Sequence, residues 1–399
     1  MPNVSRRTVL AGAAASFAGA LPAPRLPRPL DDLIALRRDL HAHPEPAGQE
    51  RRTAAVVAAR LRHAGLAVTT GVGGYGVVGV LTGARHGRTV AYRADLDAVP
   101  PSDQGGGEMV AHLCGHDIHT TVGVGVAETL ARHRDRLAGT VAFVFQPAEE
   151  ALSGAAAMLA GGLLDRIRPV EIHALHCGPF PVGEFVVNPG FGLPGLDRGR
   201  VTLTGADAAA RAQGLAAEIN QLGTVAPPRT TEDYDRLVTA LLTPGSPLAR
   251  SVFMAASAEG GQVRVFYRCW PAERHAEIRQ SVDRIARSWG AAGAEFPDDP
   301  FPAMVVPERD GLALRRHLRR AGERVRTAYA AVPFNGEDFA LFLNRMPGTF
   351  TWLGVRTPGR PVESAAPHNP AFDPDERAIG HGVRAMSSWL IHRAAAAGR

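Results

Sequence analysis

Two adjacent carboxylates, Glu149 and Glu150, follow an apolar run, Val141 to Phe145, that is typical of a buried β-strand. Open α/β sheets bind their ligands outside the carboxyl ends of the strands, so two anions there are suited to binding a cation or transferring a proton. A pair of glutamates on a protein surface is also common and can be inert. The side chains that accompany this pair therefore decide its interpretation.

A thiol and an imidazole lie close together in the segment AHLCGHDIHT, where Cys114 and His116 flank Gly115. Thiolate and imidazole suit a borderline-soft divalent metal ion, and glycine lets the backbone bend so that both side chains can face one ion. An apolar helix is expected to begin near Thr120. The alternative, a solvated loop that happens to be rich in histidine, stays open at this point.

Two more imidazoles occur at places where a metal site could form. The segment EIHALHCGP predicts a short strand, Glu171 to Leu175, that ends at His176. His173 is interpreted as a core residue or as a partner of a ligand. His368 lies in a proline-rich loop before a helix expected from about Asp375. A lone histidine in a loop is more often solvated, so His368 gains weight only from the other groups.

Together these side chains provide one thiolate, three imidazoles and two carboxylates, which are the groups that bind a co-catalytic pair of metal ions and supply a general base. At this point the chain resembles the aminoacylase and carboxypeptidase-type metallopeptidases, in the amidohydrolase branch with hippurate hydrolase, bacterial N-acyl-amino-acid amidohydrolases and plant indoleacetyl-amino-acid hydrolases. The motifs that carry the resemblance are LRRDLHAHPE (36–45), YRADLDAVP (92–100), CGHDIHT (114–120), FQPAEE (145–150), GAAAMLAGG (154–162), ALHCGP (174–179), NGEDFALFL (335–343) and PHNPAFDPDE (367–376).

The resemblance implies two divalent metal ions, with zinc or manganese favoured and cobalt or nickel tolerated by the same donors. It makes Glu149 the general base, which takes a proton from a water molecule activated by the ions and then protonates the departing amine. Asp95 and Asp117 are expected to orient histidine ligands, although a helix N-cap or a loop turn would explain each equally well. The implied metal ligands are Cys114, His116, Glu150, His176 and His368.

The resemblance also implies an α/β fold in which a largely parallel-sheet catalytic domain is interrupted by a smaller α/β lid domain of the dimerisation type. The catalytic domain would comprise residues 30–199 and 297–399, and the lid residues 200–296. Local patterns agree with this alternation of helices and strands. We expect helices at 32–41, 50–63, 208–222 and 274–289, and strands at 76–81, 89–93, 200–203 and 262–269.

The lid departs from the family pattern in two places. The glycine-glycine-histidine motif is replaced by TGADAAARAQG (204–214), and the asparagine-bearing segment by ASAEGGQVRVFYR (256–268). Both motifs supply donors for developing negative charge, and loss of one such donor can lower turnover by about a hundredfold. The groups that bind the substrate or the oxyanion are therefore unassigned, and the candidate replacements are Arg198, Arg200, Arg211 and Arg268. Relatives often pair through the lid, so a homodimer is an open alternative.

Three functions are compatible with the sequence. The favoured one is an amidohydrolase that cleaves the amide bond of an N-acyl amino acid or a similar small amide and has a remodelled lid. The second is a metal-binding protein of the same fold with little or no hydrolase activity, acting as a binding module. The third is a dipeptidase or carboxypeptidase, which the cysteine-containing motif disfavours.

The N-terminus and the composition indicate the cellular location and the kinds of partner to expect. Arg6 and Arg7, followed by a small-residue apolar run, resemble a twin-arginine export signal over residues 1–23, which implies an extracytoplasmic destination. That run is too short to span a bilayer, so no stable membrane anchor is expected.

The net charge is only +5, and arginine doublets lack interleaved aromatic residues, which disfavours nucleic-acid binding. Of the three cysteines, Cys177 and Cys269 are read as buried thiols, with a cross-link as the alternative.

Overall fold

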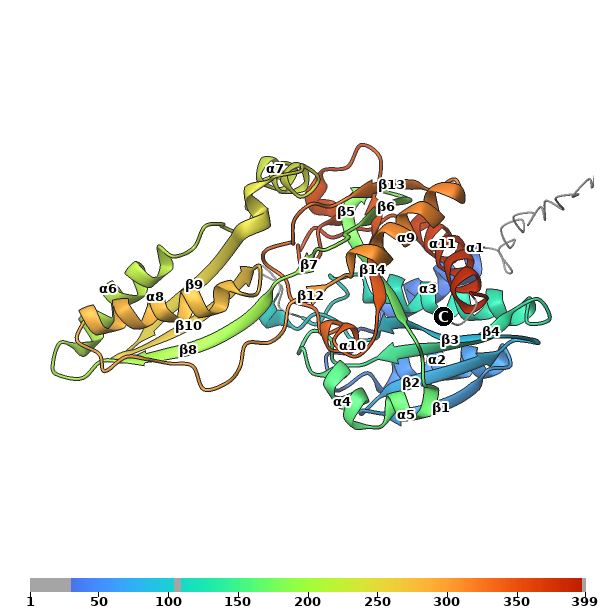
Figure 1. Cartoon of the computed structure of the whole chain (residues 1–399), viewed down its shortest axis with the longest axis horizontal. Coiled ribbons are helices and arrows are strands. Elements are labelled where there is room, and N and C mark those ends of the chain that lie inside the picture. The colour runs from blue at the N-terminus through green and yellow to red at the C-terminus, as the bar shows by residue number, and fades with distance from the viewer. Residues whose placement is uncertain (1–29, 104–108, 397–399) are drawn as a thin grey trace, which may run out of the picture.

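The structure, a computed structural model, describes residues 30–103 and 109–396, arranged as a large unit and a smaller elongated one (Figure 1). The predicted export signal, residues 1–23, lies outside the described residues. Among the helices that are described, none combines the length and the apolar composition needed to cross a membrane. All three cysteines are buried and free, so the interpretation of Cys177 and Cys269 as buried thiols is confirmed.

An eight-stranded sheet forms the centre of the large unit. Its four central strands, β4, β3, β5 and β14, run parallel to one another, and antiparallel pairs occur toward both edges. The order is β1 (Ala67–Val72), β2 (Gly76–Thr82), β4 (Ala138–Gln146), β3 (Arg85–Asp95), β5 (Ile172–Pro181), β14 (Gly348–Arg356), β6 (Glu184–Val187) and β13 (Arg324–Thr327).

Helices cover both faces of this sheet, which explains why β4 is a continuous apolar run and not an alternating one. One face packs against α1 (Leu30–His41), α2 (Arg51–His63), α3 (His116–Arg132), α9 (Glu308–Arg320) and α11 (Arg377–Ala394). The other face packs against α4 (Gly154–Ala160), α5 (Leu163–Ile167) and α10 (Ala340–Leu343). In α1, the buried Leu33, Leu36 and Leu40 recur at helical spacing and form the stripe of a helix that packs against α3 and α11.

The smaller unit is the lid, a four-stranded antiparallel sheet backed by two helices (Figure 1). Its core is formed between that sheet and the helices, separately from the cores of the large unit. The strands β7 (Gly192–Leu193) and β12 (Met304–Val305) pair where the chain passes between the units. The lid elements are β8 (Gly195–Thr202), β9 (Ser251–Glu259), β10 (Gln262–Trp270), β11 (Ala294–Glu295), α6 (Ala208–Asn220) and α8 (Arg274–Ser288).

One segment of the lid sequence belongs spatially to the large unit. Residues 224–250 connect α6 to β9 and contain α7 (Thr231–Leu241) and η2 (Pro247–Arg250). Helix α7 packs against η3 (Val362–Ala365) of the catalytic domain, above the lid in Figure 1.

The predicted α/β fold with an inserted lid is confirmed, and three details differ. Helix α3 begins at His116 and not near Thr120, so His116 lies in its first turn. Strand β5 continues to Pro181, so His176 lies within it and not at its end. Helix α7 and strand β9 were not among the predicted elements.

Candidate metal centre

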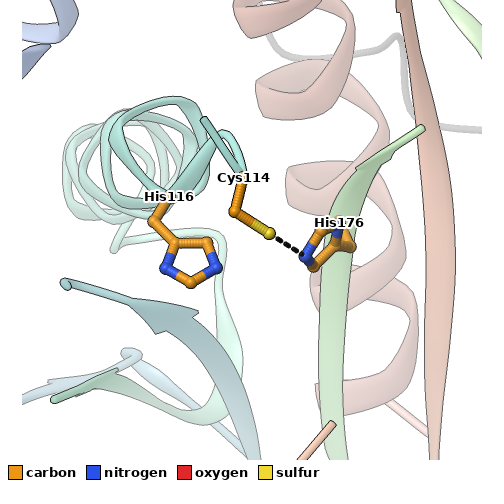
Figure 2. Close-up of side chains that lie close together, drawn as sticks. All are labelled: Cys114, His116 and His176. Carbon is orange, nitrogen blue, oxygen red and sulfur yellow. Dashed lines mark hydrogen bonds between the residues drawn. The ribbon is translucent and has the colours of Figure 1, made fainter. Parts of the chain in front are cut away.

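Four separate segments bring the predicted residues to one place at the carboxyl ends of the central strands. Cys114 and His116 come from the turn before α3 and its first residue, the glutamate pair follows β4, and His368 lies in the loop between η3 and α11. His176 belongs to β5, and Figure 2 shows its ring facing Cys114 and His116 across a small space. Gly115 makes this arrangement possible because its φ of 91° is left-handed, a conformation that glycine adopts without strain.

The distances between ligand atoms are those of a metal site. Cys114 Sγ lies 3.4 Å from His176 Nε2. On the other side, His368 Nε2 lies 3.4 Å from Glu150 Oε2, and His116 Nε2 lies 3.7 Å from Glu150 Oε1. The ligand atoms of Cys114, His116 and His176 all lie within 4.8 Å of one another, and the same holds for Cys114, Glu150 and His368. Cys114 belongs to both groups, so its sulfur could contact an ion in either group.

The hydrogen bonds of two histidines leave their Nε2 atoms directed at this space. His116 Nδ1 donates to the Asp97 carbonyl oxygen at 2.9 Å, and His176 Nδ1 donates to the Cys177 carbonyl oxygen at 2.8 Å. A carbonyl oxygen only accepts, so the Nδ1 atoms hold protons and the Nε2 atoms are available as ligands. His116 Nε2 and Glu150 Oε1 are buried without a hydrogen-bond partner.

A buried polar atom without a partner costs free energy of folding. A divalent cation bound by the thiol, imidazole and carboxylate groups of this cluster would supply the missing partner. The charge distribution agrees. Burial disfavours the charged form of His116, but Asp95, Asp97 and Glu150 outweigh that effect and raise its pKa to about 10. The negative charge around Nε2 therefore favours a cation there.

Asp97 holds the site together, although it was not among the predicted site residues. Its carbonyl oxygen orients His116, and its carboxylate accepts a hydrogen bond from the Glu150 backbone N–H at 2.9 Å. The motif YRADLDAVP contained Asp97, but its spacing did not show which aspartate faces the site.

The two aspartates that were expected to orient ligands behave differently. Asp95 accepts a hydrogen bond from His119 Nδ1 at 2.7 Å and lies 3.7 Å from His116 Nε2. Asp117 points elsewhere: its carboxylate binds His41 and Arg37, each at 2.8 Å. The expectation that Asp117 orients a ligand histidine is therefore not met, because Asp117 anchors α3 to α1.

Glu149 faces the metal ligands from a second cluster of acids. Its Oε2 lies 3.8 Å from His116 Nε2, and its carboxylate is close to Glu337 and Asp338. The buried Arg93 compensates part of this charge, since its Nη2 lies 2.9 Å from Glu337 Oε1 and 3.3 Å from Asp338 Oδ1. Burial, followed by repulsion from Glu337 and Glu150, raises the pKa of Glu149 well above its usual range. A carboxylate with raised proton affinity suits a group that accepts and returns a proton.

A cavity of about 330 Å³ opens beside these groups. Cys114, Glu149, His176 and His368 line one part of it, and apolar side chains line most of the rest. Its volume is at the lower end of small-molecule pockets, which span about 300–1,000 Å³.

Two of the four candidate lid arginines have other partners. Arg200 is exposed and pairs with Glu295 at 2.6 Å. Arg211 donates to the carbonyl oxygens of Trp289 and Thr204 at 2.8 and 2.6 Å. Both side chains therefore serve the lid itself.

Arg268 reaches from β10 of the lid to the catalytic domain. Its Nη1 lies so close to Gly336 that a methyl group there would be 2.2 Å away. Both Nε and Nη1 are buried without a hydrogen-bond partner, and the guanidinium lies 5.6 Å from the Phe266 ring. Burial and the neighbouring Arg198 lower the pKa of Arg268 to about 10, whereas Glu149 acts in the opposite direction. Arg268 is thus a cation beside the cavity wall, and its Nε and Nη1 are not used in hydrogen bonds.

Comparison with known proteins agrees with this geometry. The model of peptidase family M20/M25/M40 matches residues 91–392. This chain belongs to that family. An N-acetylcysteine deacetylase of Bacillus subtilis is 30% identical over 364 residues, which are 87% of this chain and 93% of the relative. An N-acetyldiaminopimelate deacetylase of Enterococcus faecalis is 28% identical over 381 residues, 90% of this chain and 97% of the relative.

A solved structure extends the comparison to three dimensions. The Bacillus subtilis YXEP protein, described as a dinuclear metal-binding peptidase of the M20 family, matches with a TM-score of 0.69 and 28% identity. The match covers 91% of this chain and 97% of that one. The resemblance inferred from the motifs is confirmed, and with it the prediction of a metal-dependent hydrolase that acts on amide bonds.

Proposed function

We propose that this protein hydrolyses the amide bond of N-acyl amino acids, with two divalent metal ions held by Cys114, His116, Glu150, His176 and His368 and with Glu149 as general base. Zinc or manganese suits this mixture of sulfur, nitrogen and oxygen donors best. The observation that carries the proposal is the position of Glu149, a buried carboxylate that faces both the ligand cluster and the cavity.

The proposed reaction follows from these positions. Bound ions would polarise the amide carbonyl and lower the pKa of the attacking water molecule. Glu149 accepts a proton from that water as its oxygen bonds to the carbonyl carbon. Glu149 then gives the proton to the amide nitrogen as the C–N bond breaks, which releases a carboxylic acid and an amine. Arg93 lies 2.9 Å from the neighbouring Glu337 and holds it in place beside Glu149.

Arg268 is proposed to replace the donors that the lid has lost. Its unpaired Nε and Nη1 can donate to the substrate carboxylate or to the developing oxyanion, which a guanidinium binds in two-point geometry. We also propose that the chain is exported by the twin-arginine route. The support for this is Arg6 and Arg7 with the following apolar run.

The test is a screen of metal-loaded protein against N-acyl amino acids with acetyl, long-chain acyl and benzoyl groups, reading the released amine. Glu149→Gln should retain the metal and lose about 100-fold to 10,000-fold in kcat. Glu150→Gln is the matched control, because it should lower metal content instead. Metal-loaded protein that releases no amine from any substrate would favour the second candidate, a binding protein of the same fold, and unchanged turnover by Glu149→Gln would remove Glu149 as the base.

A further inference from the structure

The segment 224–250 leaves the lid and forms one wall of the cavity beside the metal ligands. Pro227, Pro228, Tyr234, Leu237 and Leu241 from this segment line the cavity together with the catalytic domain. A loop that only joined α6 to β9 would not need to cross to the other unit. Its position instead encloses the space next to the reacting groups.

The segment is fixed to the catalytic domain by specific contacts. The Asn369 amide donates to the Tyr234 hydroxyl at 3.1 Å, and Asn369 directly follows the ligand His368. Thr231 Oγ1 donates to Glu363 of η3 at 2.6 Å, and the Leu241 carbonyl accepts from the Tyr329 backbone N–H at 2.8 Å. Leu241 is 3% exposed within a small apolar cluster that also contains Ala330. The wall therefore has a defined position relative to the metal ligands.

The charged and ligating side chains of the cavity lie where it meets the reacting groups, and Tyr234 and Asn335 are further polar residues in an otherwise mostly apolar lining. Cys114, Glu149, His176, His368 and Glu337 supply the charged and ligating groups, and none of the lining residues that the structure describes is an arginine. The chain contains no lysine. The carboxylate of an N-acyl amino acid would find no arginine or lysine among the lining residues, whereas Arg268 lies outside the cavity near Gly336. The acyl half of the substrate is the part that suits an apolar enclosure.

We infer that the α7 segment is the specificity-determining wall of an acyl pocket, and that the preferred substrates carry an apolar acyl group larger than acetyl, such as hexanoyl or benzoyl. This inference rests on the proposed function. Leu237 is the residue to vary, since it is half-buried, lines the cavity and lies on the side of α7 that faces the catalytic domain. Thr239 on the same helix is exposed and provides a matched control.

The experiment compares the wild type, Leu237→Trp, Leu237→Ala and Thr239→Trp on N-acyl alanines with acetyl, butanoyl, hexanoyl, octanoyl and benzoyl groups. In the wild type, kcat/KM should rise by about fourfold for each added methylene until the cavity is filled. Leu237→Trp should lower kcat/KM for hexanoyl and benzoyl substrates by about tenfold or more and leave the acetyl substrate within about twofold. Leu237→Ala should move the optimum to longer chains, and Thr239→Trp should leave the profile unchanged.

A second readout separates this inference from the proposed function. Calorimetry on metal-loaded Glu149→Gln protein measures the binding of acetate, hexanoate, octanoate and benzoate, the acyl products, without turnover. Binding that strengthens with chain length and is weakened by Leu237→Trp supports the wall even if no amide is hydrolysed, an outcome in which only the proposed function fails. Affinity and kcat/KM that are both insensitive to chain length, or that respond equally to Leu237→Trp and Thr239→Trp, would overturn the inference even in an active enzyme.

Discussion

Two histidines of β5 show how position along a strand decides chemistry. His173 and His176 are three residues apart, so their side chains leave the strand on opposite faces. His173 Nδ1 forms a hydrogen bond of 2.9 Å with the Thr349 hydroxyl, and its ring packs against Trp389. His176 Nε2, in contrast, lies 3.4 Å from Cys114 Sγ. The same residue type thus belongs to the core on one face and to the candidate metal centre on the other.

This contrast gives a paired prediction. His176→Ala should lose bound metal and activity, and it also leaves a void beside Phe350 and Trp352. His173→Ala should keep the metal and instead lower the free energy of unfolding by about 1–3 kcal/mol, because it leaves a void and an unpaired hydroxyl in the core. Elemental analysis and urea unfolding of both variants check this, and loss of metal from His173→Ala alone would reverse the assignment.

Arg268 carries the second prediction at this scale. Arg268→Lys keeps a positive charge but loses the planar pair of donors, so kcat/KM for N-acyl amino acids should fall by about a hundredfold. Arg264→Lys on the same strand is the control, since Arg264 is exposed and pairs with Glu259 at the lid surface. Equal kinetics for both variants would show that Arg268 only packs against Gly336.

At the scale of elements, the turn before α3 places Cys114 and His116. Gly115 has a positive φ, and a Cβ there would lie 2.7 Å from Cys177 Sγ. We expect Gly115→Ala to shift this turn and reduce metal affinity, with a loss of about 1–2 kcal/mol in stability from the backbone strain. Gly162 precedes α5 with a φ of 76° and open space around it, so Gly162→Ala should show the strain without the loss of metal.

The elements also show what could be predicted from the sequence. Helices such as α1 and buried strands such as β4 follow from local apolar patterns, and the motifs marked every proposed ligand. Helix α7 was missed although its sequence carries local signals: Thr230 and Asp233 form a capping box, and Leu237, Val238 and Leu241 recur at helical spacing. The ion pairs of Arg93 with Glu337 and Asp338 could not be predicted, because they depend on which strands become neighbours.

For the whole molecule, the buried acids around the metal centre link metal binding to stability. Removal of the metal would leave the carboxylates of Glu149 and Glu150 close together without the positive charge of the ions. Each site that is filled at 100 times its dissociation constant stabilises the fold by about 2.7 kcal/mol. A chelator should therefore lower the Tm in scanning calorimetry. Zinc or manganese should restore it, whereas magnesium, which prefers oxygen ligands, should not.

The acid stability of the whole fold should depend on a buried ion pair at the opposite end of β5 from the metal centre. Burial alone would raise the pKa of Glu171, but His173 and Arg393 outweigh that effect and lower it to about 2. The usual value is 4.5, so this stabilisation is present above about pH 4.5 and disappears as the pH falls toward 2. Glu171→Gln should reduce the free energy of unfolding by about 2–3 kcal/mol at pH 7, and the difference from the wild type should shrink below pH 4.5. Urea unfolding between pH 7 and pH 3 measures this, with the exposed Glu232→Gln as control; a difference that stays constant with pH would mean that Glu171 contributes through packing and not through its charge.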